Sequence, residues 1–257
     1  MNNADLKDRY NEIYKKGYSN HVSYNSLEES EAIAGMIPDW RNLKVLEVGC
    51  GEGRLAAMLA IKGADVTAID YSKEAIETAK KTYSMSNLEY KEDFSGKYDA
   101  VVMQGVLEHM DKPFEFLETL FKKNLNKTGC IITSSPGFIN PRGVVWMVIQ
   151  KLFDIKMSLN DLHEINPWDV WEFCGKKYKL EVRTCNTDWS TGEGCIKDFE
   201  KRFKSATFKP LVKDATGIDW SDKRIDSFLK WFELALKHMK DEGHFKGGNI
   251  IYKITRA

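Results

Sequence analysis

One stretch, residues 45–55, most constrains what this chain can fold into. It runs V-L-E-V-G-C-G-E-G-R-L: an apolar run containing one carboxylate, three glycines at alternate positions, then an amphipathic segment. This order predicts a strand, a tight turn and a helix. Glycine has no Cβ, so a ligand can lie against the backbone of such a turn. We therefore expect a binding site at the mouth of a parallel sheet, beyond the carboxyl end of its first strand.

The residues around the glycines argue against a dinucleotide. The dinucleotide fingerprint G-x-G-x-x-G needs its third glycine where this chain has Arg54. Glu47 stands two residues before Gly49, and a carboxylate there would repel a pyrophosphate. The same carboxylate suits a cationic ligand.

The pattern Glu-x-Gly-x-Gly-x-Gly after an apolar strand resembles motif I of the class I S-adenosylmethionine (SAM) methyltransferases. SAM carries a sulfonium and an ammonium but no phosphate. The resemblance implies that Glu47, Gly49, Cys50, Gly51 and Gly53 line the SAM site. A glycine-rich turn in another kind of α/β protein is the alternative that the motif alone leaves open.

A second acidic residue, Asp70, ends the next predicted strand at residues 64–69. It follows Gly53 by about 17 residues, close to the roughly 20-residue spacing of the acid that binds ribose hydroxyls. A carboxylate can accept from both hydroxyls of a diol. Asp70 could instead cap the helix at 73–81, but Ser72 is available for that role.

The resemblance also implies further cofactor contacts. After a short third strand at 88–90, Asp93 would accept from the adenine amino group and Phe94 would pack on the ring; a solvated loop is the alternative. Tyr71, beside Asp70, and Gln104, after the fourth strand, complete the predicted cofactor-binding set.

Strand and helix patterns alternate along the first half of the chain. Five strands are predicted at 43–48, 64–69, 88–90, 98–103 and 130–133, with a turn at 126–129 before the fifth. This alternation predicts an α/β fold, a doubly wound parallel sheet with helices on both faces. The resemblance implies seven strands, mostly parallel, with strands at 178–182 and 249–254 added and the last one antiparallel.

We expect a single methyltransferase domain over 1–257. Its SAM-binding core would be 41–135, preceded by a helical N-terminal cap at 1–40 and followed by helical substrate-cover inserts at 136–177 and 186–246. The cap combines an apolar helical stripe within 4–18 and a helix opened by a Ser26–Glu29 capping box. It would pack on the sheet edge or form a lid over the cofactor.

Charge and composition argue against several functional classes of protein. Lys+Arg and Asp+Glu both number 38, which argues against a nucleic-acid binder with a broad basic surface but not against a local basic patch; we expect no DNA partner, and RNA is disfavoured. No run approaches the roughly 18 apolar residues of a membrane span, and the N-terminus lacks a signal-peptide core. Five irregularly spaced cysteines indicate reduced thiols, a cytoplasmic protein and no zinc site.

The stretch after the fourth strand carries the candidate chemistry. Leu107-Glu108-His109 resembles the same group in the quinone-biosynthesis O-methyltransferases and the small-RNA 3′-end methyltransferases. In some of these a Glu-x-x-Glu-His group binds a divalent metal. Gly105 stands at the first of those positions here, so we expect no metal.

Two histidines are candidate general bases. His109 follows the fourth strand at the predicted cofactor mouth, and His163 lies on the loop after the fifth strand. A base assists methyl transfer to a hydroxyl by typically 10²–10⁴-fold. For His109, the alternative is a structural histidine at a helix start.

The prediction is therefore an enzyme that uses SAM and releases S-adenosylhomocysteine. The expected acceptor is a hydroxyl of a small aromatic or lipophilic molecule, with a small amine second and RNA or protein third. A non-catalytic SAM-binding protein is the rival class. Aromatic residues in 138–173 would line a substrate pocket, touch a membrane peripherally or form ordinary core. Oligomeric state stays open.

Overall fold

The computed structural model describes residues 26–155, 162–238 and 247–257, so the stripe predicted within 4–18 lies outside the described residues. The chain divides into two compact units. Unit 1 comprises the described residues of Met1–Pro136, Asn160–Arg183 and Ile250–Ala257. Unit 2 comprises those of Gly137–Leu159 and Thr184–Asn249, and thus draws on both segments predicted as inserts.

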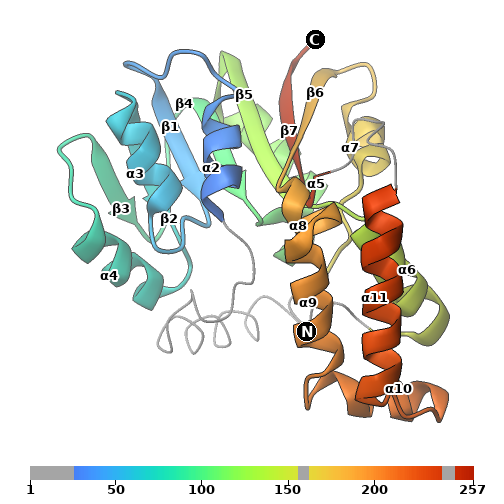
Figure 1. Cartoon of the computed structure of the whole chain (residues 1–257). Coiled ribbons are helices and arrows are strands. Elements are labelled where there is room, and N and C mark those ends of the chain that lie inside the picture. Colours follow the sequence, from blue (N-terminus) through green and yellow to red (C-terminus); the bar gives the residue numbers. More distant parts are fainter. Residues whose placement is uncertain (1–25, 156–161, 239–246) are drawn as a thin grey trace. The chain divides into compact units, whose positions relative to one another are not determined.

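Unit 1 is built on a seven-stranded sheet with strand order β3-β2-β1-β4-β5-β7-β6 (Figure 1). The first five strands pair in parallel and β7 is antiparallel, which confirms the predicted fold class. The strands are β1 Lys44–Val48, β2 Asp65–Ile69, β3 Leu88–Lys91, β4 Tyr98–Gln104, β5 Leu125–Pro136, β6 Tyr178–Cys185 and β7 Asn249–Arg256.

The helices of unit 1 follow the predicted alternation. They are α2 Ser26–Ala34, α3 Arg54–Ile61, α4 Lys73–Thr82, the short 3₁₀ helix η2 Leu107–His109, α5 Pro113–Thr119 with a following π-helical turn Leu120–Asn124, and α7 Pro167–Cys174. Ser72 caps α4 as predicted, because its Oγ accepts from Ala75 N at 3.3 Å. The central strands are buried on both faces, which explains why most of their residues are apolar.

The predicted turn at 126–129 is wrong, because these residues belong to β5. They interrupt the pairing: Tyr98 pairs with Leu125 and Ala100 with Cys130, so four residues of β5 stand opposite one of β4. Asp99 stabilises this irregularity. Its carboxylate accepts from Asn126 Nδ2 at 2.6 Å and from Lys44 N at 2.9 Å.

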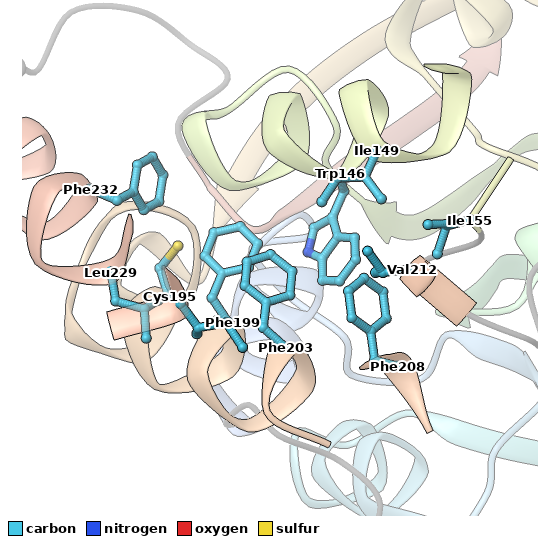
Figure 2. Packing of buried hydrophobic residues seen from close by; sticks show 11 residues of the cluster. Trp146, Ile149, Ile155, Cys195, Phe199, Phe203, Phe208, Val212, Leu229 and Phe232 are labelled. Carbon is cyan, nitrogen blue, oxygen red and sulfur yellow. The ribbon is translucent and has the colours of Figure 1, made fainter. Parts of the chain in front are cut away.

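Unit 2 is helical, with α6 Pro141–Phe153, α8 Thr187–Thr191, α9 Glu193–Phe203, α10 Phe208–Thr216 and α11 Asp222–His238. Its core is aromatic: Trp146 of α6 points toward the rings of Phe199, Phe203 and Phe208, with ring centroids 5.5–5.6 Å apart (Figure 2). Trp146 is therefore a core residue of this unit. None of the helices in the described part of the chain is long and apolar enough to cross a membrane.

Candidate functional site

The strand order reverses beside β1, and this is where the candidate site lies. β1 pairs with β2 on one side and with β4 on the other, so the loops after β1 and β4 diverge at a topological switch point. The two loops touch: a Cβ added to Gly49 would lie 2.6 Å from Val106 Cγ2. The turn after β1 is also anchored to β2, because Gly49 N and Cys50 N both donate to the Ile69 carbonyl.

The glycines of this turn are required by backbone conformation and by packing. Gly49, Gly51 and Gly53 have φ values of 72°, 52° and 82°, in the left-handed region that other residues adopt at a cost. A Cβ on Gly53 would collide with the hydroxyl of Tyr90. The sequence predicted glycines for close ligand approach; the structure adds that Gly49 and Gly53 also make room for neighbouring side chains.

Asp70 joins the glycine turn to the loop after β2. Its Oδ2 accepts from Gly51 N at 2.9 Å and its Oδ1 from Ser72 N at 2.8 Å. Burial raises the pKa of Asp70, and these two backbone donors oppose the rise. A carboxylate offers about four acceptor positions, so two remain for ligand hydroxyls.

Glu47 places a second carboxylate in the same region. Its side chain is buried, and its Oε2 has no hydrogen-bond partner among the described residues. Burial raises the pKa of Glu47 well above its usual value, and the negative charge of Asp70 adds to the rise, while the Ala56 N–H opposes it. Two buried acids with little compensating charge favour a cationic ligand that also carries hydroxyls. SAM fits this description.

The other predicted cofactor contacts lie at the same edge of the sheet. Cys50 is buried in the turn, and burial, together with the charges of Glu47 and Asp70, raises the pKa of its thiol, which keeps it neutral. Tyr71 is exposed beside Asp70, and exposed Asp93 and half-buried Phe94 follow β3. Because β1, β2 and β3 are parallel neighbours, their carboxyl ends meet at one edge.

Gln104, the last residue of β4, forms side-chain hydrogen bonds with two residues of α2. Ser30 Oγ donates to Gln104 Oε1 at 2.8 Å, and Gln104 Nε2 donates to Glu29 Oε2 at 3.1 Å. Glu29 and Ser30 are buried. The described part of the N-terminal cap therefore packs against the carboxyl end of β4. The sequence did not predict this contact, although two adjacent polar residues on the buried side of α2 are a signal for it.

The two candidate bases come from neighbouring segments. The Glu108 carbonyl accepts from Leu162 N at 2.7 Å and from His163 N at 3.1 Å, which ties the 162–163 loop to η2. His109 is half-buried, whereas the His163 ring is exposed with its Nε2 3.1 Å from the Asp111 carbonyl. Among the described residues, no group of three or more His, Cys, Asp or Glu side chains could hold a metal ion.

The segment after residue 162 lies along the ends of β4 and β5. Ser135 Oγ, at the end of β5, donates to the Ile165 carbonyl at 3.2 Å. Asn166 then begins α7 with a capping box, in which its N–H donates to Asp169 Oδ2 at 2.8 Å. Helix α7 leaves the large rings of Trp168 and Trp171 half exposed. Unit 1 therefore contains both candidate histidines and two exposed tryptophan side chains.

Comparison with known proteins gives a family and a group of relatives. A family model described as "Methyltransferase domain" matches residues 10–177. The ubiquinone biosynthesis O-methyltransferase of Psychrobacter cryohalolentis is 28% identical over 166 residues, covering 60% of each chain. The mitochondrial enzyme of that name from Schizosaccharomyces pombe is 40% identical over 91 residues, covering 31% of this chain and 33% of its own. The chain thus spans about one third to three fifths of the length of these relatives.

Two solved structures share the fold. A chain of the complex between the Haloferax volcanii Trm112 methyltransferase activator and a methyltransferase partner aligns over 96% of both chains, with a TM-score of 0.60 and 12% identity. A Thermotoga maritima structure, described as a SAM-dependent methyltransferase and possible histamine N-methyltransferase, aligns over 98% of this chain and 99% of its own, with a TM-score of 0.57 and 15% identity. At these identities the likeness shows the fold alone.

Proposed function

The chain belongs to the methyltransferase domain family, and from this premise we propose that it transfers the methyl group of SAM to a hydroxyl of a small aromatic or lipophilic acceptor. The cofactor is SAM and the product S-adenosylhomocysteine. The observation that carries the proposed site is the pair of buried carboxylates, Glu47 and Asp70, beside a glycine turn at the switch point. Such a pair suits a ligand with positive charges and a ribose diol.

The proposal assigns a role to each cofactor-site residue. Asp70 accepts from the ribose hydroxyls, and Glu47 lies near the cationic end of SAM. The turn of Gly49, Cys50, Gly51 and Gly53 lets the ligand approach the backbone. A separate set surrounds the rest of the cofactor: Asp93 and Phe94 hold the adenine, Tyr71 flanks the ribose, and Gln104 holds α2 at the mouth.

When bound, SAM supplies a methyl group already activated by the sulfonium charge. The chain has to align the acceptor oxygen with that methyl and exclude water, and orientation of this kind can be worth roughly 7–11 kcal/mol. We assign removal of the hydroxyl proton to His109, with His163 as the second candidate. The backbone link between Glu108 and the 162–163 loop supports a shared location for both imidazoles.

The acceptor class is supported by two observations. The curated relatives named above are O-methyltransferases. Trp168 and Trp171 of α7, in the same unit as both histidines, leave about half of their aromatic surface exposed. A small amine is the second candidate, because η2 places the Glu108 carboxyl next to His109, the proposed base, and a carboxylate there would favour a cationic acceptor.

The testing experiment uses SAM with a labelled methyl group and the purified chain. Host-type extract is divided into lipid, small aqueous, RNA and protein pools, and each is incubated separately. Label in the lipid or small aqueous pool would support the proposed acceptor class, and label in RNA or protein would contradict it. No label in any pool, with SAM binding demonstrated by calorimetry, would favour a SAM-binding protein without turnover.

The proposal also keeps a cytoplasmic location, because the irregular spacing of the five cysteines indicates reduced thiols. Contact with a membrane surface would be peripheral, and a hydrophobic acceptor would be its reason.

A further inference from the structure

Unit 2 contains a pocket of about 410 Å³ that the methyl-transfer proposal does not use. One wall is α6, where Val144 and Val148 stand one turn apart and are half exposed. Three aromatic side chains form much of the opposite wall: Phe203 ends α9, Trp220 precedes α11 and Phe228 lies on α11. The volume falls in the roughly 300–1,000 Å³ range of small-molecule sites.

The walls of this pocket are fixed by the core of the unit. Phe203 is almost fully buried, and its ring centroid lies 5.5 Å from that of Trp146. The same ring lies 5.3 Å from Trp220 and 5.9 Å from Phe228. Because these rings pack on one another and on the buried cluster shown in Figure 2, the pocket does not need to be formed by the ligand.

One charged side chain, Arg224, lines the pocket. Its guanidinium has no hydrogen bond or ion pair with any side chain in the described part of the chain. The nearby acids on α11 pair with other residues: Asp222 with Lys209 at 2.5 Å and Asp226 with Lys204 at 2.7 Å. The pocket therefore combines apolar walls with one uncompensated positive charge, and a guanidinium is well shaped to bind a carboxylate.

We propose that this pocket binds a single-chain anionic amphiphile, with its hydrocarbon chain between α6 and the aromatic walls and its carboxylate on Arg224. The apolar walls select against a fully polar metabolite, because they would remove its water without replacing the hydrogen bonds. A neutral hydrocarbon would leave the guanidinium unused. The inference does not depend on methyl transfer.

The test measures binding of dodecanoate to the full chain by calorimetry without SAM, below the concentration at which micelles form. Dodecan-1-ol, the neutral analogue, is measured in parallel. We expect dodecanoate to bind about tenfold or more tightly than the alcohol, because a hydrogen bond to a charged group contributes about 1.5–3 kcal/mol. Arg224→Gln should abolish this preference. Lys230→Gln, which removes an exposed cation from the same helix outside the pocket, should leave it intact.

A second pair of variants tests the pocket itself. Val148→Trp should fill it and abolish binding of both ligands, whereas Leu152→Trp, at an exposed position of α6 outside the pocket, should have little effect. Circular dichroism would verify that both variants fold. Absence of dodecanoate binding, equal affinity for acid and alcohol, or full affinity in Val148→Trp would each overturn the proposal. Binding to anionic phosphatidylglycerol vesicles but not to free dodecanoate would indicate a membrane-docking surface instead.

Discussion

Asp70 is the residue whose role the sequence predicted most directly. Its position after β2 followed from spacing alone, but its bonds to Gly51 N and Ser72 N could not be deduced, because they depend on how the two loops close. These bonds leave part of the carboxylate available. Asp70 is thus expected both to shape the glycine turn and to bind the ribose.

Replacing Asp70 with alanine should weaken SAM binding by more than about tenfold, since hydrogen bonds to a charged group contribute about 1.5–3 kcal/mol each. Isothermal titration calorimetry measures the change. Asp65→Asn, at the exposed amino end of the same strand, is the matched control and should bind like the wild type. Unchanged affinity in Asp70→Ala would remove this residue from the site.

Glu47→Gln should stabilise the protein without ligand by more than about 1 kcal/mol at pH 7, because it removes a poorly compensated buried acid. Because the folded state raises the pKa of Glu47, the difference in stability between the wild type and the variant depends on pH. Below about pH 4.5 the unfolded state is also protonated, and burial of the acid carries no ionisation cost. As pH rises from there to the folded-state pKa, the wild type loses stability and the variant does not.

Thermal unfolding of both proteins between pH 4 and 8 would measure this difference. We expect the gap between the melting temperatures to widen as pH rises, and SAM to bind the variant more weakly. A gap that is constant with pH would show that Glu47 does not carry the expected ionisation cost.

His109→Ala should lower kcat for a hydroxyl acceptor by about 10²–10⁴-fold with little change in SAM affinity, because the side chain would act on the acceptor proton. His163→Ala, one loop away, is the natural comparison. Steady-state kinetics with the acceptor found by methyl labelling would measure both. A normal rate in His109→Ala together with a loss in His163→Ala would transfer the role to His163.

At the scale of helices and strands, the prediction was accurate where the sequence carried a clear hydrophobic period or a helix-capping residue. β1, β2 and α4 lie within one or two residues of their predicted bounds. The start of β5 was missed because Asn126 and Gly129 have the composition of a turn, and only pairing with β4 shows them inside a strand. The link from α2 to Gln104 was missed for a related reason, since it joins elements about 75 residues apart.

The contact between the loops after β1 and β4 gives a prediction for the turn. Gly49→Ala should destabilise the protein by about 1–2 kcal/mol through its positive φ, plus the collision with Val106. Adding Val106→Ala should remove the collision but not the backbone strain. Chemical denaturation of the two single variants and the double variant would give the coupling. If the change in unfolding free energy of the double variant equalled the sum of the two single changes, the contact between the loops after β1 and β4 would be contradicted.

For the whole molecule, the sequence indicated late helical inserts but not their organisation. Ile225, Leu229 and Phe232 of α11, within the insert predicted at 186–246, are buried. Their partners on α6 and α9 are distant in the chain, so periodicity could not reveal a second compact unit with its own aromatic core. Nor could it reveal that Arg142 and Asp198 are buried together.

The Arg142–Asp198 ion pair provides a stability test for unit 2. The two side chains are almost fully buried, 2.7 Å apart, and Arg142 Cζ also lies 3.7 Å from the centre of the Trp189 ring. Asp198→Asn would leave the guanidinium charge buried without its partner, which typically costs about 3–5 kcal/mol. Because all these groups belong to unit 2, hydrogen exchange should accelerate in α6 and α9 more than in β1 and β4.

The pH dependence of the stability lost in Asp198→Asn shows whether the missing charge or a general misfolding causes the loss. Burial alone would raise the pKa of Asp198, but the charges of Arg142 and Arg202 outweigh it and hold the pKa below 3.8. The ion pair therefore stabilises the wild type fully above about pH 4 and less as pH falls through the folded-state pKa. The difference between wild type and Asp198→Asn should shrink in acid, and replacing both partners by Arg142→Met and Asp198→Leu should restore much of the stability. Equal exchange rates in the wild type and Asp198→Asn at neutral pH would show that the pair contributes nothing to unit 2.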